Sequence, residues 1–101
     1  MKTYGLIGFP LEHSFSATYF KEKFEREHIE AQYLNFPLHD LDSFPDFLLH
    51  THPDGLNVTI PYKERIIRHV HELDPLAEKV GAVNCIQIRN GRLNGFNTDV
   101  I

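Results

Sequence analysis

Short apolar runs of strand length alternate with segments of helical periodicity along this chain of 101 residues. The first three runs cover residues 3–8, 31–36 and 56–60. Between the first two, residues 16–28 repeat large apolar side chains at helical spacing. Strands that alternate with helices pair in parallel, because each helix returns the chain to the same end of the sheet. The alternation predicts one α/β domain over residues 1–101, a three-layer sandwich around a mixed, mostly parallel sheet.

Three more helices are expected further along the chain. A helix over residues 42–50 would begin at Ser43 as its N-cap. Residues 61–73 predict an amphipathic helix, and a short helix over 75–80 would end at Gly81 in a left-handed conformation. The apolar positions that mark the helix over 61–73 are Tyr62, Ile66, Ile67, Val70 and Leu73.

The strongest turn signal is Asn90-Gly91, because a two-residue type I′ hairpin turn needs a positive φ at both positions. It separates the runs 82–88 and 92–97, which predict an antiparallel pair that closes the sheet.

Composition excludes several classes of partner. A net charge of -4 argues against nucleic acid and anionic membranes. The single cysteine, Cys85, excludes an internal disulfide and fits the reducing cytoplasm. The first apolar run is too short for a signal sequence or a membrane span.

Polar residues cluster where strands end. Ser14 and Ser16 lie between a strand and a helix N-terminus, where free amides and the helix dipole favour an anion such as a carboxylate. One serine could instead merely cap the helix.

A second cluster surrounds the run 56–60. Asn57 and Thr59 lie two apart on the expected strand and would share a face. Pro61 suits the first turn of a helix, which would place Lys63 at the helix start. The dipole there tends to lower the pKa of a lysine, so Lys63 is either an acid–base group or a surface cation.

A third cluster combines Asn84, the polar residue in an apolar run, with Asp99, which follows the last strand. Open α/β sheets bind ligands at the carboxyl ends of their strands. Asn84 could also be satisfied by backbone, and Asn97 to Asp99 could form an Asx-type turn.

Together, the motifs "GFPLEHSFS", "GLNVTIPYKE", "GAVN" and "GFNTD" closely resemble the N-terminal substrate-binding domain of shikimate dehydrogenases. The resemblance covers essentially the whole chain, and four motifs in register are far more specific than any one alone. It implies an oxidoreductase of aromatic amino-acid biosynthesis, which interconverts 3-dehydroshikimate and shikimate with NADPH.

The resemblance also implies a role for each matching residue. The two serines would bind the shikimate carboxylate, the amides and the threonine its ring hydroxyls, and Lys63 would serve in acid–base catalysis beside Asp99. The implied substrate-binding residues are Ser14, Ser16, Asn57, Thr59, Lys63, Asn84 and Asp99.

The sequence departs from the family pattern at several places. Ala17 replaces a usual proline, Phe20-Lys21 a common His-Asn pair, and Cys85 a frequent threonine. The sequence has no G-x-G-x-x-G, and the chain ends at Ile101, where the dinucleotide-binding domain of the family begins. We therefore expect that domain to be absent, with NADP bound outside this chain and the chain alone inactive.

The missing part of the family fold leads to a further expectation. In that family a C-terminal helix packs onto this domain. Without it an apolar area would be uncovered, and we expect the chain to bury that area by forming a homodimer.

Other functions fit less well. A quinate/shikimate dehydrogenase or a stand-alone shikimate-binding module remains open. The histidine pairs His50/His52 and His69/His71 lack a third ligand at useful spacing, so we expect no metal. Cys85 sits in an apolar run with no base nearby, which disfavours a nucleophile.

Overall fold

The computed structural model describes residues 1–11 and 15–99, without the side chains of residues 15 and 16. The strands are β1 (Lys2–Gly8), β2 (Ala31–Pro37), β3 (Gly55–Val58), β4 (Glu72–Leu73), β5 (Cys85–Arg89) and β6 (Arg92–Phe96). The α-helices are α1 (Phe15–Arg26), α2 (Phe44–Thr51) and α3 (Pro75–Val80), and the 3₁₀ helices are η1 (Leu41–Ser43) and η2 (Arg65–His69).

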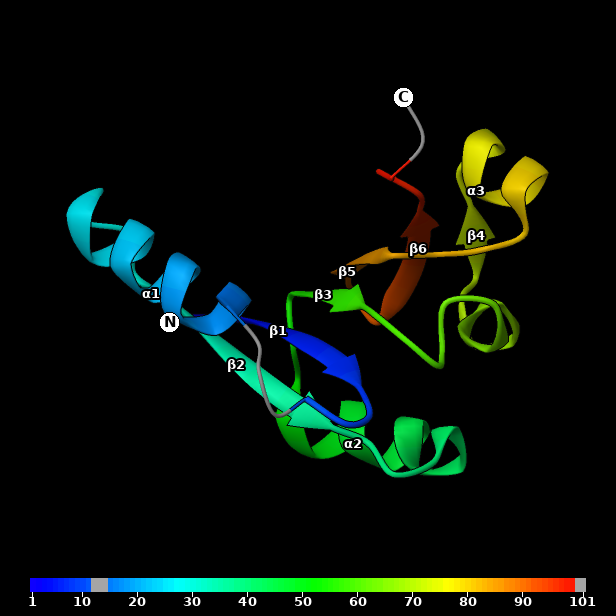
Figure 1. The fold of residues 1–101 in the computed structure, drawn as a ribbon, viewed down its shortest axis with the longest axis horizontal. Helices are drawn as coiled ribbons and strands as arrows, with labels where there is room; N and C mark the ends of the chain where they lie inside the picture. Colours follow the sequence, from blue (N-terminus) through cyan, green and yellow to red (C-terminus); the bar gives the residue numbers. More distant parts are fainter. Residues whose placement is uncertain (12–14, 100–101) are drawn as a thin grey trace.

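Within the described residues the strands form one six-stranded sheet in the order β2-β1-β3-β5-β6-β4. The pairs β1–β2, β1–β3 and β4–β6 are parallel, whereas β3–β5 and β5–β6 are antiparallel. Helix α1 lies beside β2, and β6 with α3 lies at the other end of the sheet (Figure 1). The predicted mixed, mostly parallel sheet is confirmed.

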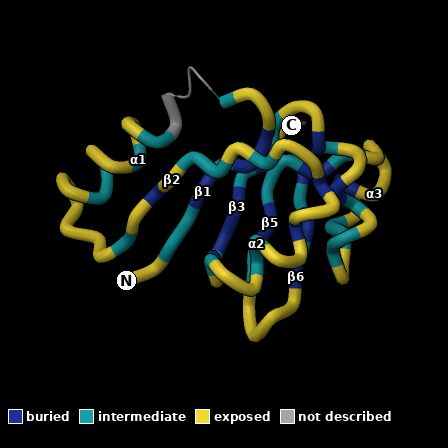
Figure 2. Tube along the Cα trace, turned by 90° about the horizontal axis from the view of Figure 1, so that it is seen from below, coloured by how far each residue is buried: buried dark blue, intermediate teal, exposed yellow. Residues whose placement is uncertain are grey.

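One face of the sheet carries the hydrophobic core. Alternate strand residues point to it, among them Ile7, Leu56 and Ile86, and they pack against side chains of α2, η2 and α3. Phe44 of α2 is fully buried in this cluster. The dark blue segments of Figure 2 accordingly concentrate in the central strands, whereas α1 is exposed along most of its length.

The opposite face is covered by α1, and only over part of its width. Phe20 of α1 stacks on Tyr33 of β2, with ring centroids 4.6 Å apart, and Phe24 contacts Tyr4 of β1 at 6.2 Å. Helices on both faces give the three layers expected from the sequence. Helix α1 contacts β2 and β1 in this way. The same face of β3 and β5 forms the floor of a hollow of about 820 Å³.

The turn predictions are confirmed. Asn90 and Gly91 have φ values of 52° and 75°, as a type I′ turn requires, and β5 pairs with β6 across them. Gly81 ends α3 in the left-handed region at φ 77°. Ser43 occupies the N-cap position of α2, but its hydroxyl donates to Asp40 O at 2.9 Å instead of capping that helix.

The amphipathic helix predicted over residues 61–73 is wrong. The Ile60–Pro61 bond is cis, and the chain turns through Lys63 before η2 begins at Arg65. The last two residues of the segment form β4, which pairs with β6. The predicted core positions Tyr62 and Ile66 are nevertheless buried.

No helix formed by residues 1–11 and 15–99 is both long and apolar enough to cross a membrane.

Candidate functional site

Four segment ends meet at one edge of the sheet. The parallel pairing places the carboxyl ends of β1 and β3 side by side, and the antiparallel pairing brings the start of β5 beside the end of β3. The end of β6 joins them, because Phe96 lies opposite Cys85. Helix α1 follows β1 at this same edge, so the polar residues that flank these ends are collected in one place.

An ion pair joins the segments that follow β3 and β6. The Lys63 ammonium donates to Asp99 Oδ2 at 2.9 Å, although the two residues are far apart in sequence. Their side chains are 37% and 55% exposed, so both can reach a ligand. The hydrogen bond from Lys63 holds the pKa of the Asp99 carboxyl below its usual range, against a smaller opposing effect of burial.

The turn that carries Asp99 is fixed by two asparagines. Asn97 Oδ1 accepts from the Asp99 backbone N–H at 3.0 Å, which is the Asx-type turn weighed from the sequence. Asn97 Nδ2 donates to Ala82 O at 3.1 Å. Asn84 contacts Thr98 twice: its Oδ1 accepts from the backbone N–H at 2.9 Å, and its Nδ2 donates to the hydroxyl at 2.8 Å. Asn84 therefore holds the turn that presents the catalytic candidate Asp99.

Backbone hydrogen bonds join the loops around the pair. Val83 N–H donates to Lys63 O at 2.7 Å, and Val58 N–H donates to Asn84 O at 2.8 Å. Asn84 N–H in turn donates to Phe96 O at 3.0 Å. These bonds fix the loops before β5, after β3 and after β6 relative to one another without using any side chain.

Thr59 lies just beyond β3 rather than within it, which corrects the predicted strand. Its N–H still donates to Ile7 O at 2.9 Å. Its methyl group occupies the space beside Gly8, where an added Cβ would lie only 2.4 Å from Thr59 Cγ2. Glycine at position 8 thus permits the close approach of the two loops.

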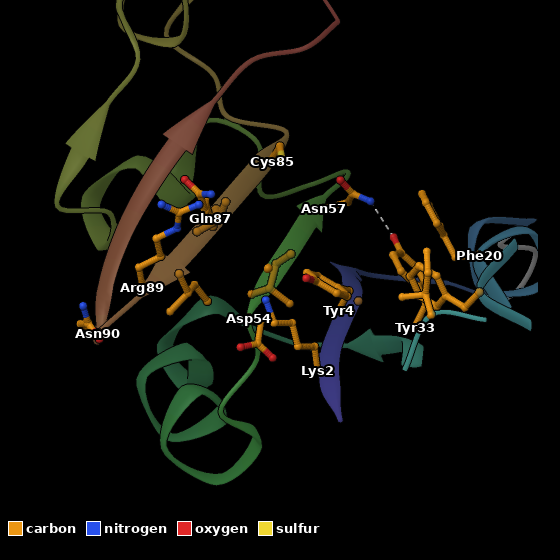
Figure 3. A pocket seen from close by; sticks show the side chains of 17 residues that line it. Lys2, Tyr4, Phe20, Tyr33, Asp54, Asn57, Cys85, Gln87, Arg89 and Asn90 are labelled. Carbon is orange, nitrogen blue, oxygen red and sulfur yellow. Dashed lines mark hydrogen bonds between the residues drawn. The ribbon is translucent and has the colours of Figure 1, made fainter. Parts of the chain in front are cut away.

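Asn57 projects from β3 toward the side of the sheet that α1 covers. Its Nδ2 donates to the hydroxyl of Tyr33 at 2.7 Å, and Figure 3 shows this bond across the wall of the hollow. The same face continues along β5 through Cys85, which lies opposite Asn57, and Gln87.

A family model described as "Shikimate dehydrogenase substrate binding domain" matches residues 6–86 of this sequence. The chain belongs to this family. The shikimate dehydrogenase (NADP(+)) of Oceanobacillus iheyensis is 40% identical over 99 residues, which cover 95% of this chain and 36% of that protein.

Solved structures of the shikimate dehydrogenase family agree. Shikimate dehydrogenase 1 from Peptoclostridium difficile has a TM-score of 0.90 at 40% identity, covering 98% of this chain and 38% of that chain. Shikimate 5-dehydrogenase from Listeria monocytogenes was solved in complex with shikimate and NAD. It has a TM-score of 0.90 at 35% identity, covering 98% of this chain and 35% of that chain. This chain thus spans little more than a third of the length of these relatives.

The structure brings together most of the residues that the family resemblance singled out. Lys63, Asn84 and Asp99 form one hydrogen-bonded group, and Asn57 and Thr59 flank it on and after β3. Ser14 lies outside the described residues, as does the side chain of Ser16. The helix-dipole argument for Lys63 is wrong, because this residue lies in a turn before a 3₁₀ helix.

Sequence reasoning missed one contributor to the site, Tyr33. It weighed Asn97 and Thr98 only as members of a possible Asx-type turn before Asp99, and that turn is present. The bond from Asn57 to Tyr33 joins residues 24 positions apart, and no local pattern indicates it.

Two of the histidines weighed as metal ligands make hydrogen bonds within the fold. His71 Nδ1 accepts from the Leu93 N–H at 2.9 Å, and His50 Nδ1 lies 2.7 Å from Asp46 O. Within the described part of the chain, no three His, Cys, Asp or Glu residues are grouped so as to hold a metal ion. Burial raises the pKa of the Cys85 thiol, which opposes formation of a thiolate nucleophile.

Proposed function

We propose that this chain is the substrate-binding half of a shikimate dehydrogenase, an enzyme that reversibly reduces 3-dehydroshikimate to shikimate with NADPH. The observation that carries the proposal is the Lys63–Asp99 pair, 2.9 Å apart at the ligand-binding edge of an α/β sheet. Membership of the family and the names of the relatives support the substrate. The single cysteine favours a cytoplasmic location.

The polar groups at the edge match the chemistry of the substrate. In the sequence Ser14 directly precedes the first residue of α1 and Ser16 is the second residue of that helix, and hydroxyls and free amides at a helix N-terminus favour a carboxylate. Thr59, Asn57 and Asn84 supply neutral donors and acceptors suited to ring hydroxyls. Because Asn84 already holds the 97–99 turn, it contributes to the site both by contact and by positioning.

Proton transfer is assigned to Lys63. An ammonium group has three N–H donors, and one is directed at Asp99 Oδ2. Another can donate to the substrate oxygen at C3 and deliver its proton as the carbonyl becomes a hydroxyl. Asp99 stays ionised, since its pKa is lowered, and it orients both the ammonium and the substrate hydroxyl.

NADP does not fit the residues of this chain. A dinucleotide site needs a glycine-rich turn between a strand and a helix, so that backbone N–H groups can surround the pyrophosphate. The connection from β1 to α1 has no glycine after Gly8 and contains Pro10. We therefore assign the cofactor to a separate dinucleotide-binding domain outside this sequence, and we derive no hydride step from it.

The test is a titration of the ¹⁵N-labelled chain with shikimate, followed by chemical-shift mapping. We expect perturbations at the sheet edge, centred on Lys63, Asn84 and Asp99, and none with NADP. Quinate serves as a parallel ligand that separates the two possible preferences. Shifts clustered around His50 and His52, at the C-terminal end of α2, would contradict the proposal.

A further inference from the structure

A tyrosine that no motif includes lies directly behind one of the ligand-binding candidates. The hydroxyl of Tyr33 is 2.7 Å from Nδ2 of Asn57, and the contact joins β2 to β3 across the intervening strand β1. In Figure 3 the Tyr33 ring reaches over from its own strand, and its hydroxyl end faces the Asn57 amide. The bond is therefore a tertiary one, set by the packing of three strands.

Tyr33 is held more firmly than Asn57. It is only 7% exposed, and its ring stacks on Phe20 of α1 at 4.6 Å with an interplanar angle of 21°. It also lies directly opposite Tyr4 in the register of β1 and β2. A buried ring held by this stack places its hydroxyl at one point, whereas the Asn57 amide can rotate about its own side-chain bonds.

In this contact the amide nitrogen is the donor and the tyrosine hydroxyl the acceptor, which leaves the amide oxygen for a ligand. The nitrogen of Asn57 donates to Tyr33, so the amide is turned with its nitrogen toward α1. Among the described residues Oδ1 of Asn57 has no hydrogen-bond partner. An amide oxygen is an acceptor only, and it therefore selects a group that donates, such as an alcohol hydroxyl.

We propose that Tyr33 is a positioning residue that orients the Asn57 amide, so that position 57 presents an acceptor oxygen to a substrate hydroxyl. The inference rests on the proposed function for the identity of the ligand. The orientation itself rests only on the contacts of the chain.

The first experiment needs no ligand. In Tyr33→Phe the ring and its stack on Phe20 remain, and only the hydroxyl is lost. The side-chain NH₂ resonances of Asn57 in a ¹H–¹⁵N spectrum should then move, because one proton loses its acceptor. Tyr19→Phe is the matched control, since the Tyr19 ring also contacts Phe20 but the residue is 55% exposed. Asn57 resonances that stay in place in Tyr33→Phe would overturn the proposal.

The second experiment measures shikimate affinity in a double-mutant cycle. Tyr33→Phe should weaken binding about fivefold, the size expected for one neutral hydrogen bond. In the Asn57→Ala background the same substitution should have no further effect, because Tyr33 acts through Asn57. An equal loss in both backgrounds would show a general structural role and overturn the proposal, as would unchanged affinity in the single variant.

The two proposals fail separately. A wild-type chain that binds no shikimate would contradict the proposed function. The orienting role would then be decided by the Asn57 resonances alone.

Discussion

Breaking the Lys63–Asp99 pair should separate catalysis from stability. The two side chains are 37% and 55% exposed, and double-mutant cycles on exposed pairs give about 0.2–1 kcal/mol. A domain of this size shifts its melting temperature by about 4–8 °C for each kcal/mol. Asp99→Asn and Lys63→Met should therefore cost at most about 8 °C and leave the fold intact.

Turnover should respond far more strongly. A positioned proton donor contributes about 10²- to 10⁴-fold in rate, and its effect is realised in the transition state more than in the bound substrate. In the full-length enzyme proposed above, Lys63→Met should lower kcat by at least about 100-fold, whereas KM for shikimate changes by less than about tenfold. Steady-state assays of NADP reduction measure both quantities.

The chain offers a matched control for this experiment. Arg92 and Glu72 form a second exposed ion pair, with Nη2 and Oε2 3.5 Å apart, between β6 and β4. Glu72→Gln removes a comparable interaction away from the candidate site and should change neither kcat nor KM. A Lys63→Met enzyme that keeps more than a tenth of wild-type turnover would refute the assignment of Lys63 as proton donor.

Three further results are expected. The pKa of the Asp99 carboxyl, followed by NMR, should lie below the usual carboxyl range and return to that range in Lys63→Met. The contribution of this carboxylate to stability is present above its unfolded-state pKa and is lost as the pH falls through the lowered folded-state pKa. An Asp99 pKa that is the same in Lys63→Met as in the wild type would contradict Lys63 as the cause of the lowered pKa. Ile86→Val, in the core at 1% exposure, should cost about 0.5–1.5 kcal/mol in urea unfolding, whereas the same change at the exposed Ile29 should cost less than about 0.5 kcal/mol; equal costs would show that the core is misassigned. Sedimentation of the isolated chain should show the expected homodimer, formed over the uncovered face beside α1, and a monomer at all concentrations would exclude it.

Local chemistry was enough to predict most of the fold. The Asn90-Gly91 turn and the Gly81 helix end each depend on backbone preferences of one or two residues, and both are confirmed. The strand at β1 and the helix at α1 follow from periodicity, which depends on which face each element buries.

Residues 61–73 show where such reasoning stops. Their apolar side chains do face the core, but the spacing fits a turn, a 3₁₀ helix and a short strand as well as it fits an α-helix. The choice is made by distant partners: His71 N–H donates to Leu93 O and Asp74 N–H to Gly95 O, at 2.9 and 2.8 Å. A two-residue strand exists only because β6 offers this edge.

The candidate site, like the fold, was predicted only in part from the sequence. Residue types singled out Lys63 and Asp99 separately, and only the family resemblance placed them side by side, where the structure shows their direct contact. The partners that position the site side chains, such as Tyr33 for Asn57, come from strands that the sequence alone does not place in order.

The backbone bonds that join the loops at the sheet edge have an evolutionary consequence. A peptide C=O persists through any substitution, and an N–H through any except proline, so replacing the side chain at Lys63 or Asn84 leaves the bonds from Val83 and Val58 intact. The candidate ligand-binding positions can therefore change while these backbone bonds persist, whereas a change at Asn84 also removes its two bonds to Thr98.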